Sequence, residues 1–216
     1  MSSPALEVLV LGNQIFAEEV ADLIGETPGL ELAGFVENLD PARCKALLLG
    51  KRVHWITELA GLHEPVHLLC GLGTNRRSTY VEQVGAYNLP FATLIHPTAR
   101  VSKASTVGVG SIISVNSVVA AHTTLGLHTI VNRGALIGHH TQIGDYVTIA
   151  PGANIAGKCV VEAGCYISMG AVIIDRVRIG ANSVVGAGAV VTKDVPANVQ
   201  VVGVPARIVK EGVVGR

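Results

Sequence analysis

The sequence predicts an α/β domain with a parallel sheet over residues 1–94, followed by an all-β parallel β-helix over residues 95–216 that ends in a C-terminal tail. Three observations predict this fold class. Apolar strands alternate with amphipathic helices in the first part, and an aliphatic residue recurs at every sixth position in the second. Residues that tolerate positive φ then follow the aliphatic positions at a fixed offset, as tight corners require.

The first part contains five expected strands and four expected helices. Asp40 and Pro41 form a helix start, with Asp as the cap and Pro at the first helical position. Alternation of strands and helices predicts a parallel sheet. In chain order we expect a strand over 7–12, a helix over 15–25, a strand over 30–36, a helix from 41 to about 49, a strand near 53, a helix over 57–62, a strand over 66–72, a helix over 75–87 and a strand over 91–95.

The second part repeats with a period of six. Every sixth residue from Ile95 to Val191 is Ile, Leu or Val, without exception. If one residue in three were of these types, such a run would arise about once in 10⁸ sequences. The residue two positions earlier is small in each case. Two inward positions per hexad describe one flat side of a narrow prism, so three sides make an 18-residue coil, and the chain should hold roughly five to six coils.

The corners of the prism are marked three residues after most of the aliphatic positions. There the sequence has glycine or a polar residue that accepts positive φ. These residues are Asn116, His122, His128, Gly134, His140, Gly152, Gly164, Gly170, Asn182, Gly188 and Asp194. For His122 and His128, this backbone preference is a sufficient reason for the residue type.

Composition excludes several classes of partner. Lys and Arg total 16, as do Asp and Glu, so no net field attracts nucleic acid or an anionic membrane. No apolar run reaches the length of a membrane helix, and residues 1–5 lack the basic start of a secretory signal. The four cysteines show no CxxC spacing, which favours reduced thiols and a cytoplasmic location.

Three further motifs carry a resemblance to a known family. They are Leu94-Ile95-His96-Pro97-Thr98-Ala99, Asn132-Arg133-Gly134-Ala135-Leu136-Ile137-Gly138-His139 and Val202-Gly203-Val204-Pro205-Ala206-Arg207. With them, nearly the whole chain resembles the PglD/NeuD-like sugar acyltransferases, a group of hexapeptide-repeat enzymes. The resemblance implies a left-handed β-helix after a Rossmann-like domain that binds a nucleotide-linked sugar. It also implies a homotrimer with each active site between two prisms.

The same resemblance implies an activity and its central residues. Members acetylate an amino group, or sometimes a hydroxyl, of a nucleotide-linked sugar with acetyl-CoA, for bacterial surface glycan synthesis. His139 matches the general base, a role that suits a neutral imidazole, and Asn132 would help to hold the sugar. His140 follows the base where the family has Asp or Glu, and it is counted among the residues that contact the substrate. Gly157 lies 18 residues after His139, one coil or about 4.8 Å along the same edge, and its N–H would stabilise the oxyanion.

The remaining site residues are also assigned by resemblance. Thr148 stands where the family often has a second His and is counted, with Gly157, among the CoA contacts. The CoA arm is expected to run along the prism edge past Met169 and Ala187 toward Arg207. In the first domain, Glu18 and Glu19 oppose a phosphate at the helix start. The sugar nucleotide is expected to contact Gly12, Asn13, Gln14, Glu37, Asn38 and Asn75.

Two other functions stay open at this point. The altered first loop and His140 are compatible with a trimeric prism that binds a ligand or acts as a scaffold without catalysis. His122 and His140 lie 18 residues apart and could approach a zinc ion shared between chains, as in prism-shaped carbonic anhydrases. No His-x₄-His pair occurs in the prism, however, so no metal site is expected.

Overall fold

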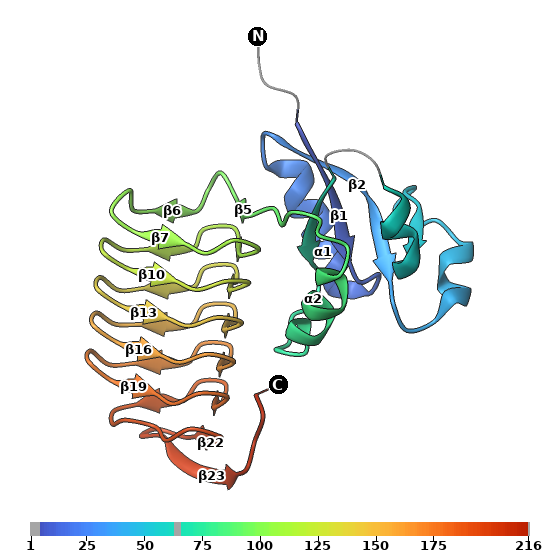
Figure 1. Ribbon diagram of the computed structural model, residues 1–216. Coiled ribbons are helices and arrows are strands. Elements are labelled where there is room, and N and C mark those ends of the chain that lie inside the picture. Colours follow the sequence, from blue (N-terminus) through green and yellow to red (C-terminus); the bar gives the residue numbers. More distant parts are fainter. Residues whose placement is uncertain (1–4, 63–65, 216) are drawn as a thin grey trace. The chain divides into compact units, whose positions relative to one another are not determined.

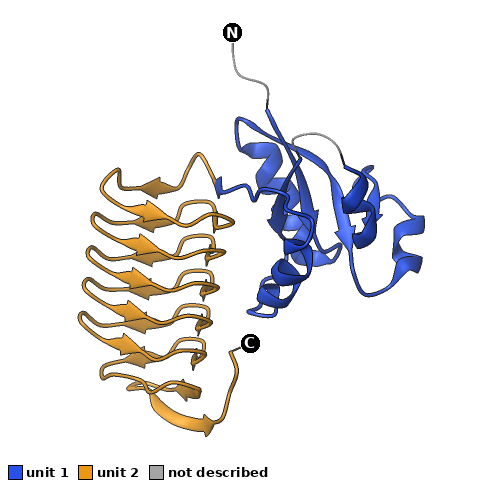
Figure 2. Cartoon of the chain, in the orientation of Figure 1, with its two compact units in different colours: residues 1–94 blue, residues 95–216 orange. Residues whose placement is uncertain are grey.

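The computed structural model describes residues 5–62 and 66–215, which belong to two compact units, residues 1–94 and 95–216 (Figure 2). Residues 1–4, on which part of the argument against a secretory signal rests, lie outside the described residues. Within the described ranges, no helix is long and apolar enough to cross a membrane.

The first unit is built on a parallel sheet, as predicted, but this sheet has four strands rather than the five expected (Figure 1). The strand expected over 91–95 is not part of it, because Phe91 forms only an isolated bridge with Leu68, and Leu94 and Ile95 pair in a sheet of the second unit. The four strands are β1 (Leu6–Leu11), β2 (Leu30–Glu37), β3 (Val53–Trp55) and β4 (Val66–Cys70), in the order β3-β2-β1-β4. Helix α1 (Ile15–Glu26) follows β1, and α2 (Arg77–Gly85) follows β4. Helix α1 buries an apolar face that includes Val20, Leu23 and Ile24, and α2 buries Tyr80, Val81 and Val84.

Two of the expected helices are 3₁₀ helices, and the first of them is shorter than predicted. The segment expected to be helical from 41 to 49 is a 3₁₀ helix, η1 (Pro41–Lys45), and the next is a second 3₁₀ helix, η2 (Ile56–Gly61). Asp40 does cap η1, because its side chain accepts a hydrogen bond from Ala42 N at 2.9 Å. None of the residues of η1 is buried, and Leu49 beyond it is exposed, so no apolar face stabilises a longer helix.

The second unit is the predicted column of β-coils, with one short strand on each side of each coil (Figure 1). Every strand from β6 to β18 pairs in parallel with the strand 18 residues further on, as Leu136 does with Asn154. The strands are β5 (Leu94–Ile95), β6 (Arg100–Val101), β7 (Thr106–Val107), β8 (Ile112–Ile113), β9 (Val118–Val119), β10 (Thr124–Leu125), β11 (Ile130–Val131), β12 (Leu136–Ile137), β13 (Gln142–Ile143), β14 (Thr148–Ile149), β15 (Asn154–Ile155), β16 (Val160–Val161), β17 (Tyr166–Ile167), β18 (Val172–Ile173), β19 (Arg178–Ile179), β20 (Val184–Val185) and β21 (Val190–Val191).

The core of the column follows the six-residue pattern. From Ile113 onward, each aliphatic residue of the pattern is fully or almost fully buried. The first three differ, because no coil precedes them to cover them: Ile95 is 39% exposed, and Val101 and Val107 are only partly buried. Polar residues at the small positions are satisfied internally. Thr123, for example, donates from Oγ1 to the carbonyl of Gly138 at 2.9 Å.

The predicted corners have positive φ at every position except Asp194. The reason is a change of period at the end of the column. Val185 pairs with Val201, and Ile179 with Val195, so the last coil is two residues shorter than the others. Asp194 instead accepts a hydrogen bond from Arg178 N at 2.8 Å. The chain then ends in an antiparallel pair, β22 (Val199–Val202) and β23 (Arg207–Glu211).

Candidate functional site

His139 lies on a corner of the column that we call the histidine ridge. This ridge consists of the residue pairs 121–122, 139–140, 157–158 and 175–176. Backbone hydrogen bonds join its successive coils: Lys158 N donates to His139 O at 2.8 Å, and Arg176 N donates to Gly157 O at 3.1 Å. His139 and Gly157 are therefore on neighbouring coils of one ridge, as the 18-residue spacing predicts.

The imidazole of His139 lies directly against the backbone of Gly157. A Cβ atom added to Gly157 would be 2.9 Å from His139 Nε2 and 2.9 Å from its Cε1. Gly157 does not have positive φ, so the backbone does not require glycine here. The equivalent positions of the other coils all carry side chains: Val109, Val115, Ala121, Leu127, Arg133, His139, Asp145, Pro151, Ala163, Met169, Asp175, Ala181 and Ala187. The glycine is thus explained by the imidazole beside it.

The amide of Gly157 is available to a ligand. Among the residues that the structure describes, none accepts a hydrogen bond from Gly157 N, although its carbonyl is bonded to Arg176. An N–H beside the nitrogen of a candidate base is the arrangement that an oxyanion requires. The ridge therefore presents a proton acceptor and a hydrogen-bond donor side by side.

His140 packs against His139 rather than pointing away from it. The two Nδ1 atoms are 3.0 Å apart, and the two rings are almost perpendicular at 89°. The ring of His122, one coil earlier, lies 4.8 Å from that of His140 between centroids. Desolvation, together with His122, His139 and Lys158, lowers the pKa of His140.

Met169 and Ala187 lie on a different corner of the column, and Asn132 lies directly before the same corner. We call this corner the methionine ridge; it consists of the residue pairs 133–134, 151–152, 169–170 and 187–188. One sheet, formed by β6, β9, β12, β15, β18 and β21, separates it from the histidine ridge. Gly157 and Met169 are therefore two hexads out of phase and do not share one edge of a single chain. The expected path of CoA past Met169 stays a prediction. Asn132 Oδ1 accepts a hydrogen bond from Arg133 N at 2.7 Å.

A groove of about 490 Å³ runs beside the methionine ridge. Arg133, Tyr166, Met169, Ala187 and Gln200 are among the residues that line it. Thr148 does not line this groove; it begins β14, and its side chain is buried. Arg207 is exposed on β23 and borders a separate hollow.

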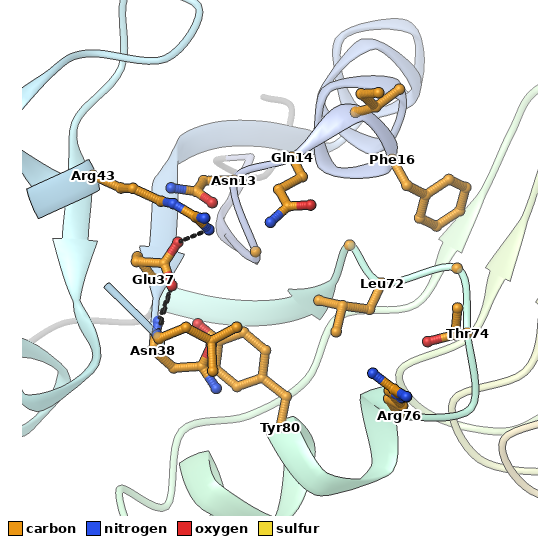
Figure 3. Close-up of a pocket in the computed structure, with 15 residues that line it drawn as sticks. Asn13, Gln14, Phe16, Glu37, Asn38, Arg43, Leu72, Thr74, Arg76 and Tyr80 are labelled. Carbon is orange, nitrogen blue, oxygen red and sulfur yellow. Dashed lines mark hydrogen bonds and ion pairs between the residues drawn. The ribbon is translucent and has the colours of Figure 1, made fainter. Parts of the chain in front are cut away.

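The first unit has a pocket of about 390 Å³ at the carboxyl ends of β1, β2 and β4 (Figure 3). Ligands of open parallel sheets bind in this kind of crevice. The pocket brings together most of the residues that the sequence assigned to the sugar nucleotide: Gly12, Asn13, Gln14, Glu37 and Asn38. Asn75 is not among its lining residues and instead lies in the turn that precedes α2.

Glu37 stabilises the loop that lines this pocket. Its carboxylate is 3% exposed and accepts hydrogen bonds from the amides of Asn38 and Leu39 at 2.9 and 2.6 Å. Its other oxygen is 3.4 Å from Arg43 (Figure 3). Tyr80 donates from its hydroxyl to Val36 O at 2.7 Å, and burial raises the pKa of this hydroxyl, so it stays protonated. Both carboxylate oxygens of Glu37 thus interact with the loop or with Arg43, so few of their lone pairs can accept a hydrogen bond from a ligand.

Two positively charged residues of the pocket were missed by sequence reasoning. Arg43 and Arg76 both line the pocket, whereas the start of α1 carries no side-chain cap and has Glu18 in its first turn. Arg76 follows directly after the Gly73-Thr74-Asn75 turn, so that turn was the signal that could have revealed it. Within residues 5–62 and 66–215, no group of three His, Cys, Asp or Glu side chains is arranged to hold a metal ion.

Comparisons with known proteins place this geometry in a family. The family model for the bacterial transferase hexapeptide (six repeats) matches residues 158–193. The galactoside O-acetyltransferase of Escherichia coli K12 is 60% identical over 35 residues, which are 16% of this chain and 17% of that enzyme. The match thus spans about a sixth of the length of this curated relative.

Two solved structures match almost the whole chain. PerB from Caulobacter crescentus, in complex with CoA and GDP-perosamine, has 30% identity, a TM-score of 0.86, and coverage of 97% of this chain and 100% of PerB. The acetyltransferase domain of PglB from Neisseria gonorrhoeae, in complex with acetyl coenzyme A, has 28% identity, a TM-score of 0.86, and coverage of 95% and 100%. The fold is therefore a Rossmann-like domain followed by the left-handed β-helix of hexapeptide-repeat acyltransferases. Within that class, the chain belongs to the PglD/NeuD-like sugar acyltransferases.

Proposed function

We propose that this protein transfers the acetyl group of acetyl-CoA to an amino group of a nucleotide-linked sugar, in bacterial surface glycan synthesis, with His139 as the general base. The observation that carries the proposal is the contact between the His139 imidazole and the backbone of Gly157, at a position where the fold does not need glycine. A hydroxyl of the same class of sugar is the second acceptor to consider.

The chemistry follows from this pair of residues. The sugar amine attacks the thioester carbonyl, and His139 Nε2 takes the proton that the amine loses. The negative charge that develops on the carbonyl oxygen is stabilised by Gly157 N–H, a contribution of about 3 kcal/mol for one such donor. The intermediate then collapses, the C–S bond breaks, and the leaving thiolate takes the proton from the His139 imidazolium, which gives CoA, the amide and a neutral His139.

The pocket of the first unit is the proposed site for the nucleotide. Asn13, Gln14 and Asn38 line it and offer amide groups for a base or a ribose. Arg76 is the proposed partner of the diphosphate, because Glu18 disfavours an anion at the start of α1 and Arg43 is already paired with Glu37. Gly12 would let the ligand approach the backbone, and Asn75 would shape the turn that presents Arg76.

The two ridges support a homotrimer with sites between neighbouring chains. The sheet between them presents Leu136, Val172 and Ile174, which are 41%, 37% and 39% exposed. A second copy that covers this apolar face would bring the methionine ridge of one chain near the histidine ridge of another. CoA would then lie along the groove beside Met169 and Ala187 and reach Gly157 of the neighbour. In this arrangement, Arg207 and Thr148 stay candidates for CoA contacts.

The proposed location is the cytoplasm, and all four cysteines are free thiols, as a reducing compartment favours. The experiment that tests the function incubates the protein with acetyl-CoA and a panel of nucleotide-linked amino sugars and follows release of free thiol. GDP-perosamine is the first compound to use, because it is the sugar nucleotide bound in the PerB structure. Thiol release that depends on the sugar supports the proposal. No release with any sugar, together with no binding of CoA by calorimetry, favours the non-catalytic scaffold instead.

A further inference from the structure

His139 is in contact with another histidine through its second ring nitrogen. Its Nε2 lies beside Gly157, and its Nδ1 is 3.0 Å from Nδ1 of His140. A neutral imidazole has one N–H and one acceptor nitrogen. Because two N–H groups cannot form a hydrogen bond with each other, only one of the two Nδ1 atoms can carry a proton when this contact is made.

We propose that His140 is a positioning residue for the acetyl transfer: its Nδ1 accepts the Nδ1–H of His139 and so holds His139 in the tautomer with its lone pair on Nε2, beside Gly157. This inference rests on the proposed function. It gives His140 the orienting task that a carboxylate has in the family, in place of the contact with substrate that the sequence suggested.

The surroundings of His140 favour the accepting state. The titratable and charged groups that face it are His122 on the preceding coil, His139 beside it and Lys158 on the following coil. Desolvation is the largest cause of its lowered pKa, and these three groups act in the same direction. A neutral His140 with its proton on Nε2 leaves a lone pair on Nδ1 for His139.

The pair has a chemical consequence during catalysis. When His139 Nε2 takes the proton of the amine, His139 becomes an imidazolium, and its Nδ1–H bond to His140 becomes charge-assisted and stronger. No proton has to pass to His140. A carboxylate at this place would also orient His139, but its negative charge would raise the pKa of the base.

The corner geometry supplies well-matched variants. His140 has φ of 58°, a conformation that Asn and Gly accept. His140→Asn keeps an acceptor oxygen on the same branch of the side chain but cannot titrate, whereas His140→Gly removes the acceptor without backbone strain. His140→Glu introduces the charge. Asn182→Gly is the control, because Asn182 has φ of 58° and lies on the corner of the column that belongs to neither ridge.

Kinetics over a range of pH test the role. We expect His140→Gly to lower kcat roughly 10- to 100-fold, as a misplaced catalytic group does, with little change in the KM for sugar. His140→Asn should retain most of kcat, and Asn182→Gly should match the wild type. In His140→Glu, the acidic limb of kcat/KM should move to higher pH by about one unit, because a nearby negative charge favours imidazolium. An unchanged kcat in His140→Gly, or a His140→Asn rate as low as that of His140→Gly, would overturn the proposal.

A spectroscopic measurement separates this inference from the proposed function. In protein labelled with ¹⁵N-histidine, long-range ¹H–¹⁵N correlations at neutral pH report which nitrogen of each ring carries the proton, and the single variants assign the signals. We expect Nδ1–H on His139 and Nε2–H on His140. Nε2–H on His139 would exclude the pair as described. This result is obtained whether or not any sugar is acetylated, whereas absence of turnover in the wild type contradicts only the proposed function.

Discussion

The Nε2 atom of His139 lies 2.9 Å from the point where a side chain on Gly157 would begin. This contact joins two residues that are 18 positions apart in the sequence and one coil apart in the column. The 18-residue period of the coil thus brings together an imidazole and a bare backbone amide, and this arrangement depends on these two residues.

Gly157→Ala tests this contact. The backbone of Gly157 does not have positive φ, so alanine is compatible with the fold, but its methyl group would displace the imidazole. We expect kcat to fall at least about 10-fold, because displacement of a catalytic group by 1 Å can cost 100-fold in rate. Steady-state kinetics and a thermal melt provide the measurement.

The matched control is Gly25→Ala in α1. A Cβ atom there meets nothing within 4 Å, and its φ is also not positive. This variant should keep the wild-type rate and melt at an equal or slightly higher temperature. If Gly157→Ala retained full activity, the close approach of His139 would have no catalytic meaning.

Arg76→Ala tests the proposed phosphate contact in the pocket of the first unit. Loss of one charge-assisted hydrogen bond, worth about 1.5–3 kcal/mol, should raise the KM for the nucleotide sugar roughly 10- to 100-fold and leave the KM for acetyl-CoA unchanged. Arg52→Ala is the control, because Arg52 is an exposed residue paired with Glu58 and does not line the pocket. Equal KM values for the sugar in both variants would mean that another group binds the phosphates.

Leu136→Glu tests the assembly. The residue lies on the apolar sheet between the two ridges, so a buried carboxylate there should oppose association. We expect light scattering to show a smaller species and the activity to be lost with the trimer. Thr124→Glu, which is exposed at the start of β10 on another sheet, should leave both mass and activity unchanged. A trimer of normal mass in Leu136→Glu would place the interface elsewhere.

The column was predictable from the sequence because its period is short and its inward positions admit few residue types. Val147 and Cys159, for example, occupy the small inward positions and are completely buried. The pattern failed where the period changed, since nothing in the spacing of Asp194 shows that the last coil is two residues shorter. It failed also for η1, where the cap at Asp40 was visible but the absence of a packing partner was not.

The candidate site was only partly predictable. The spacing of His139 and Gly157 was sufficient to place them together. The family resemblance assigned Asn13 and Asn38 to one site, and both line the same pocket. The sequence could not show that the Glu37 carboxylate accepts hydrogen bonds from loop amides, because those contacts depend on the path of residues 38–40. Nor could it show that His140 turns its Nδ1 toward His139, since side-chain direction at a corner is set by packing against His122.

The central claim is that the imidazole beside Gly157 removes the proton in the transfer step. A single-turnover experiment tests it most directly: protein saturated with acetyl-CoA is mixed with GDP-perosamine, or with the best acceptor found, and formation of the amide is followed for the wild type and for His139→Asn. The account predicts a rate constant about 10²- to 10⁴-fold lower in His139→Asn, with unchanged binding of CoA by calorimetry. Equal rate constants in the two proteins would contradict it.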